Sequence, residues 1–281
     1  MISSPTSKIE SGTTHTEHIL SRLNRLPPFN QTAVRLLGRP FGDEDSIGDL
    51  EASFRSDPGL ASQLLVAANS AAFGFRAHVS TIRHALAVLG MDRIRSLVAT
   101  LATSAYMHQF PAAVVRPIWS HAIATAVIAE KLAGYSDRLS GSALYTAGLT
   151  HDLGRLGLLA STRKKYESFL FDEFQDREES ELCEWDTFGV IHTVAGGLLT
   201  RLWGFPESLC SHAENHHVET GFDTEEDRIV HRGCLLADAL GYPELRLRST
   251  GEPGEMAKWQ GEFAGDSCRE TVEQTIQDFL L

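Results

Sequence analysis

The spacing of apolar residues constrains the fold more than any other feature of this sequence. Apolar side chains recur at three- and four-residue steps in most of the chain, a period that lines one face of an α-helix. One such stripe comprises Ile118, Ala122, Ile123, Ala126 and Val127. No run of β-branched residues alternates with polar ones over the length of a strand. We therefore predict an all-α fold.

Prolines, glycines and capping residues divide the predicted helices. Pro58 follows Asp57, and proline is favoured at a helix start because its missing N–H has no partner there. Pro111 and Pro117 bracket the change to a second half, whose first helix we expect from residue 118. The predicted helices cover residues 19–26, 31–37, 47–54, 58–68, 81–89, 94–106, 118–132, 142–149, 193–202, 229–240 and 267–280.

These boundaries predict how the chain is organised. We expect a flexible arm over residues 1–18, which is rich in Ser and Thr, and an N-terminal helical subdomain over residues 19–110. A C-terminal helical domain over 111–250 and a loop with a last helix over 251–281 follow. Residues 171–184 are rich in Asp and Glu, and such a run is usually a solvated surface.

Composition excludes several classes of protein. Lys and Arg number 25 and Asp and Glu 37, which gives a net charge of −12. A nucleic-acid partner needs a clustered cationic face, so we expect none. A hydrophobic fraction of 42% supports a sizeable core, which argues against disorder. No run approaches 18 consecutive apolar residues, so we expect no membrane span.

The cysteines indicate a reducing compartment. Cys183, Cys210, Cys234 and Cys268 form no C-x-x-C pair, so we predict neither a disulfide framework nor a thiolate zinc site. The N-terminal segment lacks the apolar core of a signal peptide. A cytoplasmic protein is the expectation that fits both observations.

Histidines and aspartates of the second half are the candidate functional residues. Each histidine lies in or beside an apolar helical segment, and imidazole with carboxylate suits Zn, Mn, Fe or Ni. Adjacent side chains on a helix project about 100° apart, so a His-Asp pair converges only on something between them. A histidine on an apolar face is, however, more often a hydrogen-bonded core residue, so the residues alone leave metal binding open. The candidates are His121, His151, Asp152, His192, His216, His217 and Asp238.

An ordered succession of motifs over about residues 20–240 resembles the HDOD domain, a bacterial regulatory relative of the HD superfamily. No single motif is specific, but their order is. The matching stretches are Leu26-Pro27, Asp57-Pro58-Gly59-Leu60, Ala68-Asn69-Ser70, Ile82 through Gly90, Trp119 to His121, Gly148 to Arg155, Phe188-Gly189 with His192, Trp203 to Glu207, and His216-His217.

The resemblance implies a metal site and an architecture. HD proteins are metal-dependent phosphohydrolases with a His…His-Asp…Asp pattern, which falls here on His121, His151, Asp152 and Asp238. The HD-GYP branch, which resembles cyclic-di-GMP phosphodiesterases, adds three histidines that correspond to His192, His216 and His217. Many HDOD proteins are expected to have lost part of this set, whereas this chain keeps it. The implied fold is an N-terminal helical subdomain packed on a C-terminal HD-type metal-binding domain.

Two departures from the pattern affect what the resemblance implies. Arg155 stands where HD-GYP enzymes carry Lys, and Pro117 stands where some relatives use a Glu ligand. We therefore expect one or two divalent ions (Fe, Mn, Ni or Zn) rather than three. Gly241-Tyr242-Pro243 spells GYP but follows Asp238 rather than the His pair, and we interpret it as coincidence.

Three functions follow as alternatives. In the first, a phosphohydrolase cleaves a phosphate ester or a (cyclic di)nucleotide, with Asp152 and Arg155 as catalytic residues and Arg155 binding the phosphate. In the second, a regulatory module binds a nucleotide or a signalling protein partner without turnover. In the third, the metal is purely structural.

Overall fold

The prediction of an all-α fold is confirmed. The computed structural model describes residues 16–38, 46–69, 78–249, 263 and 266–279, and its regular elements are almost all helices. The strands within these ranges are two short ones, β1 (Glu173–Phe174) and β2 (Arg246–Leu247). They pair in parallel, with Glu173 opposite Arg246.

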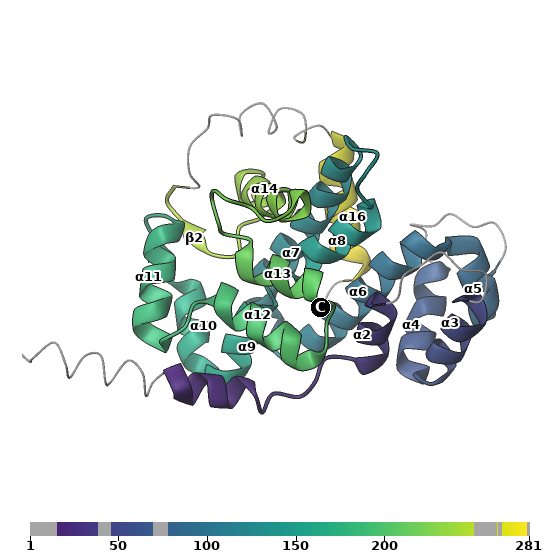
Figure 1. Cartoon of the computed structure of the whole chain (residues 1–281), viewed down its shortest axis with the longest axis horizontal. Coiled ribbons are helices and arrows are strands. Elements are labelled where there is room, and N and C mark those ends of the chain that lie inside the picture. The colour runs from purple at the N-terminus through teal and green to yellow at the C-terminus, as the bar shows by residue number, and fades with distance from the viewer. Residues whose placement is uncertain (1–15, 39–45, 70–77, 250–262, 264–265, 280–281) are drawn as a thin grey trace, which may run out of the picture.

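The N-terminal helices form a group at one end of the molecule (Figure 1). Three of them begin after a capping side chain, of which Asp57 was expected at a helix start: the side chains of Asn30, Asp57 and Thr81 each accept a hydrogen bond from the backbone of the following turn. The helices are α2 (Gln31–Leu37), α3 (Ser46–Arg55), α4 (Pro58–Ala68), α5 (Ile82–Leu89) and α6 (Met91–Met107).

The first described helix contacts the C-terminal half of the chain. Residues 16–23 are helical, although the predicted flexible arm included residues 16–18. Thr16 donates to the Gly189 carbonyl at 2.7 Å, and Arg22 donates to the Ser161 carbonyl at 2.9 Å. The rest of that predicted arm, residues 1–15, lies outside the described residues.

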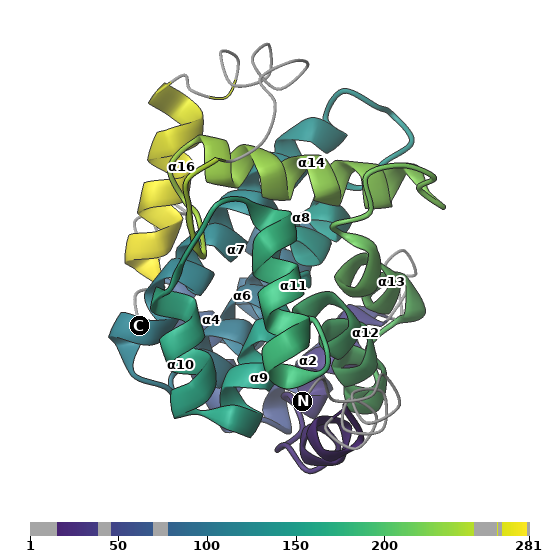
Figure 2. The ribbon, with the colours of Figure 1, turned by 90° about the vertical axis from the view of Figure 1, so that its left-hand side faces the viewer.

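The C-terminal half is a second helical bundle around α7 (Figures 1 and 2). α7 packs mainly against α8 and α14, and α9 packs against α12. The elements are α7 (Ala112–Ala133), α8 (Gly141–Thr150), α9 (Leu153–Thr162), α10 (Lys164–Phe171), α11 (Arg177–Phe188), α12 (His192–Trp203), α13 (Glu207–Asn215), α14 (Glu225–Ala239) and α16 (Asp266–Asp278).

Helix α7 begins six residues before the predicted start. It runs from Ala112 through Pro117, whose missing N–H leaves the Ala113 carbonyl without its usual helical donor. The helix is long and apolar enough to cross a membrane by length and composition alone, with a mean hydropathy of 1.4 over its most apolar window. Because 72% of that window is buried among the other helices, α7 is the core helix of this bundle.

Polar and aromatic contacts join the two halves. The Tyr145 hydroxyl on α8 lies 3.1 Å from Thr100 Oγ1 on α6, and both groups are buried. At another point Phe29 stacks on Trp203 with ring centroids 5.6 Å apart. The N-terminal helices therefore pack on the C-terminal bundle, as the predicted architecture requires.

The prediction of a solvated surface over residues 171–184 is wrong for one face of the segment. Most of it forms α11, which begins after the Asp176 side chain caps the Glu179 N–H at 2.9 Å. Ser180, Glu184 and Phe188 face inward, and Glu184 is only 1% exposed. The acidic run is therefore amphipathic, with one buried face. The buried carboxylate of Glu184 is tolerated there because Tyr166 and His192 donate hydrogen bonds to it.

Candidate metal centre

Six of the seven candidate residues lie at or near the ends of helices, and the seventh lies inside the core helix α7. His121 is in the middle of α7, and Asp238 is near the end of α14. His151 and Asp152 form the junction between α8 and α9, and His192 is the first residue of α12. His216 and His217 follow directly after α13. We call these seven residues the centre.

Close approach of helix backbones gives the centre its shape. A Cβ on Gly154 would lie 1.9 Å from the His192 carbonyl oxygen and 2.6 Å from the Gly196 nitrogen, so α9 and α12 touch there. A Cβ on Gly148 would lie 2.8 Å from the Ala126 Cα, so α7 and α8 also touch. The glycines bring the His151–Asp152 junction next to His192 on one side and α7 on the other.

The histidines of the centre share one orientation. In each, Nδ1 faces an acceptor-only oxygen, which places the ring proton on Nδ1 and leaves Nε2 as an acceptor. Arg177 donates to this atom in His217, and Arg155 Nη2 lies 3.4 Å from it in His192. Metal-binding histidines are held in the same way, with one ring nitrogen bonded to the metal and the other N–H donated to a protein oxygen. The Nδ1 partners are the Tyr242 carbonyl for His121 (2.9 Å), the Gly148 carbonyl for His151 (2.5 Å), Glu184 Oε2 for His192 (2.7 Å), the Ala213 carbonyl for His216 (3.0 Å) and Glu181 for His217.

Several buried polar atoms of the centre have no hydrogen-bond partner. Burying such an atom costs free energy unless something compensates it, so each needs an explanation. A divalent cation provides one, because it accepts imidazole and carboxylate lone pairs together. The residues present therefore fit a metal. The atoms are His151 Nε2, Asp152 Oδ1 and His216 Nε2. Asp238 Oδ1 and Glu244 Oε2 also lack a hydrogen bond, but they face His121 Nδ1 at 3.1 and 3.0 Å.

The structure groups the predicted ligands into clusters, and only one of the two expected ligand sets forms a cluster of its own. His192, His216 and His217 come together, with ligand atoms within 4.8 Å of one another. Asp152 stands beside them, its Oδ1 3.7 Å from His192 Nε2 and 3.9 Å from His216 Nε2.

The expected set of His121, His151, Asp152 and Asp238 does not form one such group. His121 instead belongs to two: with His151 and Cys234, and with Asp238 and Glu244.

Arg155 is fully occupied by protein acceptors. Its guanidinium is 1% exposed and donates to Asp152 Oδ2 at 2.9 Å, to Glu244 Oε1 at 3.2 Å and to the Tyr166 hydroxyl at 3.3 Å. Burial lowers its pKa, but the charges of Asp152, Tyr166 and Glu244 outweigh burial and raise it overall. In this geometry Arg155 holds Asp152 so that Oδ1 faces the histidines. It is not free to bind a phosphate.

Arg177 is the cation that sequence analysis missed. As the first residue of α11, it reaches inward and donates to Asp238 Oδ2 and to His217 Nε2, and its Nη1 lies 3.7 Å from Glu244 Oε1. Its side chain is 18% exposed, so it covers the centre from outside. A cation in the first turn opposes the helix dipole, and that signal could have marked Arg177 in the sequence.

Cys234, Glu184, Glu181 and Glu244 were also missed. Cys234 lies one helical turn before Asp238, with Sγ 3.5 Å from His121 Nε2. Burial raises the pKa of its thiol, but Arg177 and His121 outweigh burial and lower it to about 7. Helical spacing from Asp238 was the available signal for Cys234. Glu181 and Glu244 are far in sequence from the histidines they contact, and Glu184 lies in an acidic run that we expected to be solvated, so no local pattern identified them.

Charges within the centre are strongly coupled. Burial lowers the pKa of His216 and His217 well below the usual range, and nearby positive groups add to the effect. These two imidazoles are therefore kept neutral, as metal ligation requires. Burial and Glu244 raise the pKa of Asp238. For Glu244, burial is outweighed by His121 and the two arginines, which hold its pKa well below the usual range.

The centre is closed to solvent in this conformation. Its histidines and aspartates have residual exposures of 8% or less, including the His217 side chain. A surface cavity of about 370 Å³ near α8, α13 and α14 is lined by His212 and Asp227, but by none of the seven residues. A substrate of nucleotide size would have to displace side chains that separate the centre from solvent. Arg177, whose side chain is 18% exposed, is one of them.

Comparisons with known proteins identify the class. The HDOD domain family matches residues 26–219, more than half of the chain. The chain therefore belongs to the HDOD family, and its fold is of the HD type. No curated protein matches it.

Solved structures share this fold. An HDOD domain protein of unknown function from Geobacter sulfurreducens aligns with a TM-score of 0.79 and 20% identity, over 97% of this chain and 100% of that one. A candidate metal-dependent phosphohydrolase from Shewanella amazonensis aligns at 0.63 and 15%, over 96% and 99%. A candidate signal transduction protein from Marinobacter aquaeolei aligns at 0.65 and 20%, over 96% and 65%.

Proposed function

We propose that this chain is a cytoplasmic HDOD regulatory protein that binds one or two divalent metal ions at its buried centre and signals through a partner without fast turnover. The observation that carries the metal assignment is the set of unpartnered atoms on His151, Asp152 and His216. All are buried and all belong to side chains whose other polar atom is held by the protein.

A bound divalent metal would lower the pKa of a coordinated water and polarise a phosphate oxygen. The chain's own residues do the rest of the work. Glu184 and the backbone carbonyls of Gly148 and Ala213 fix the ring orientations. Arg155 fixes Asp152, and the packed helices exclude bulk water from the centre.

The cover over the centre favours regulation over catalysis. Arg177 neutralises Asp238 and contacts His217, so the side of the centre toward solvent already holds a cation. A phosphate ester would compete with the carboxylates for this arginine and would have to enter a site with residual exposures of 8% or less. Metal binding, in contrast, requires only that an ion of small radius enter.

A metal-dependent phosphohydrolase is the second candidate. The complete set of HD-type histidines and aspartates favours it, as does the likeness in fold to the Shewanella protein whose name carries that activity. In that case the ligand would be a phosphate ester or a cyclic dinucleotide, and α11 with Arg177 would have to move aside for each turnover.

A turnover assay separates the two candidates. The chain, loaded in turn with Mn²⁺, Fe²⁺, Ni²⁺ and Zn²⁺, would be assayed with bis(p-nitrophenyl) phosphate and with cyclic dinucleotides. We expect no turnover above that of the matched Asp152→Asn variant. Hydrolysis by the wild type that disappears in Asp152→Asn, while the variant keeps its melting temperature, would establish the phosphohydrolase instead.

A further inference from the structure

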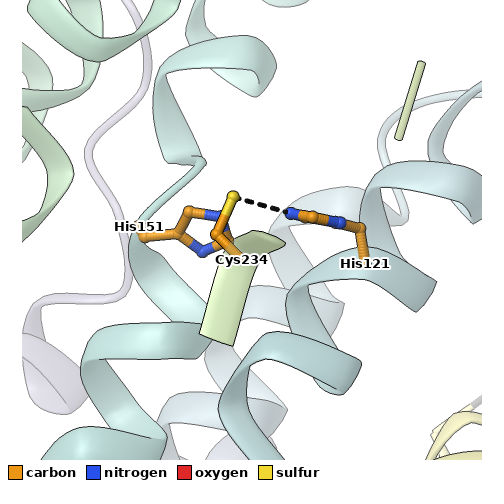
Figure 3. Close-up of side chains that lie close together, drawn as sticks. All are labelled: His121, His151 and Cys234. Atoms are coloured by element: carbon orange, nitrogen blue, oxygen red, sulfur yellow. Dashed lines mark hydrogen bonds between the residues drawn. The ribbon is translucent and has the colours of Figure 1, made fainter. Parts of the chain in front are cut away.

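Two histidines of the expected ligand set converge with a cysteine that was not expected to be a ligand. His121 from α7, His151 from the end of α8 and Cys234 from α14 point toward one another (Figure 3). One ligand atom from each lies within 4.8 Å of the other two, and all three residues are buried. The Cys234 sulfur is 3.5 Å from His121 Nε2.

We propose that Cys234 is a thiolate ligand and that His121, His151 and Cys234 together hold one metal ion, with Zn²⁺ the best fit. The inference rests on the proposed metal binding of the centre and names the ligand set and the metal class. It replaces the carboxylates of the expected pattern, at this ion, with a sulfur.

One distance within this set of three matches the edge of a tetrahedral zinc site. Zinc binds cysteine sulfur at about 2.3 Å and histidine nitrogen at about 2.0–2.1 Å. Two such bonds at a tetrahedral angle separate sulfur and nitrogen by about 3.5 Å. The distance of 3.5 Å between Cys234 Sγ and His121 Nε2 equals this edge, so these two atoms could bind one ion without rearrangement.

Both histidines direct Nε2 toward the cysteine sulfur. The Nδ1 atoms of His121 and His151 are bonded to backbone carbonyls of Tyr242 and Gly148, which turns both Nε2 atoms toward the sulfur. His151 Nε2 has no hydrogen-bond partner although it is buried. The competing contact of His121 Nε2 is the Thr125 hydroxyl at 3.5 Å, a distance at the limit of a hydrogen bond.

The aspartate expected at this ion has a different role. Asp238 Oδ2 accepts from Arg177, and Oδ1 lies 3.1 Å from the Nδ1 side of His121, away from the ligand nitrogen. Asp238 therefore supports His121 as an outer-shell carboxylate. A protein with three such ligands keeps a fourth position for water or a small ligand.

A thiolate changes which metal the site selects. Soft sulfur ligands favour Zn²⁺ and other borderline metals over Mn²⁺ and Mg²⁺, which prefer oxygen. The absence of a C-x-x-C pair led us to expect no thiolate zinc site. One cysteine placed a helical turn before Asp238 is sufficient, because the fold supplies both histidines from other helices.

Cobalt substitution and X-ray absorption test the assignment directly. The wild-type chain would be loaded with Co²⁺ for optical spectra and with Zn²⁺ for zinc-edge absorption. We expect a thiolate-to-cobalt charge-transfer band in the near ultraviolet and one sulfur at about 2.3 Å from zinc. Cys234→Ser should remove the band. The matched control Cys210→Ser should keep it, because Cys210 is buried on α13 and its Sγ contacts the Phe205 carbonyl instead.

The outcomes distinguish this inference from the proposed function. Stoichiometric cobalt and zinc with only nitrogen and oxygen neighbours would overturn the thiolate ligand and leave metal binding intact. A chain that takes up no metal would overturn both. The absorption measurement on the wild type stands alone even if Cys234→Ser does not fold.

Discussion

Glu184 holds His192 at two points: its Oε2 accepts hydrogen bonds from the backbone N–H and from the ring Nδ1 of His192, each at 2.7 Å. One carboxylate thus fixes both the start of α12 and the orientation of an imidazole of the centre. The pair links the acidic helix α11, which carries Glu184, to the metal centre.

Replacing this carboxylate should weaken metal binding. Loss of an outer-shell partner typically reduces metal affinity about 10- to 100-fold, because the ligand becomes less basic and less well oriented. We expect Glu184→Gln to raise the Kd for Zn²⁺ within that range in a titration against a competing chelator. Glu178→Gln, on the exposed face of the same helix, is the control and should bind as the wild type does. Equal affinities for the two variants would remove Glu184 from the centre.

Arg177 is expected to compete with metal. It neutralises Asp238 and Glu244 in the described conformation, and two charges at about 4 Å interact by about 4 kcal/mol at an effective dielectric constant near 20. We expect Arg177→Gln to bind Zn²⁺ at least about tenfold more tightly, since about 1.4 kcal/mol suffices for that factor.

Thermal unfolding supplies a second test of Arg177. Without metal, the variant should melt at a lower temperature than the wild type, because buried carboxylates lose their partner. With saturating Zn²⁺ the difference in melting temperature between the variant and the wild type should become smaller. The control is Arg201→Gln, which replaces an exposed arginine paired with Glu207 and Glu214. It should change neither the affinity for Zn²⁺ nor the melting temperature. Weaker metal binding by Arg177→Gln would contradict the competition.

Gly154 should tolerate no side chain. An added Cβ would meet the His192 carbonyl oxygen at 1.9 Å and push α9 from α12. We expect Gly154→Ala to lower the free energy of unfolding by about 3 kcal/mol, the upper part of the usual overpacking range, and to reduce metal content. Gly48→Ala, where a Cβ has no neighbour within 4 Å in α3, should stabilise the protein by about 0.5–1 kcal/mol. Denaturant unfolding measures both.

We predict that the buried Tyr145 hydroxyl, at the contact between the two halves, makes the stability of the protein fall at alkaline pH. Burial raises the pKa of its hydroxyl to about 12, from an ordinary value of 10.0. The folded state thus favours the neutral phenol more than the unfolded state does. Its contribution to stability is complete below about pH 10 and is lost as the pH rises toward 12.

Unfolding experiments on Tyr145→Phe check this sign. Removing the bond to Thr100 should cost about 1 kcal/mol at pH 8. Between pH 10 and pH 11.5 the wild type should lose more stability than Tyr145→Phe, because only the wild type carries this ionisable group. Parallel pH profiles for the two proteins would show that Tyr145 is not held neutral by burial.

Helical periodicity was sufficient to predict the fold and the approximate position of most helices. Local patterns also drew attention to Asp57 and the His151–Asp152 pair, because caps and adjacent ligands act over a few residues. The start of α7 was misplaced because a proline inside a helix resembles a boundary.

The outer parts of the centre could not be predicted in the same way. An Asp/Glu-rich run is usually solvated, so α11 offered no sign that Glu184 is buried. Glu244 reaches its position through the turn at Gly241, whose φ of +96° suits glycine, and the Tyr242 carbonyl then binds His121. The GYP sequence taken as coincidence is therefore a structural turn beside the centre.

Metal content of the chain, measured by elemental mass spectrometry on protein without an affinity tag or chelators, tests metal binding most directly. We predict at least one equivalent of Zn, Fe, Mn or Ni in the wild type and in His84→Ala, whose histidine is exposed. The double variant His151→Ala/His216→Ala should contain no stoichiometric metal. A metal-free wild type after reconstitution with each ion, or a double variant that keeps its metal, would contradict the assignment.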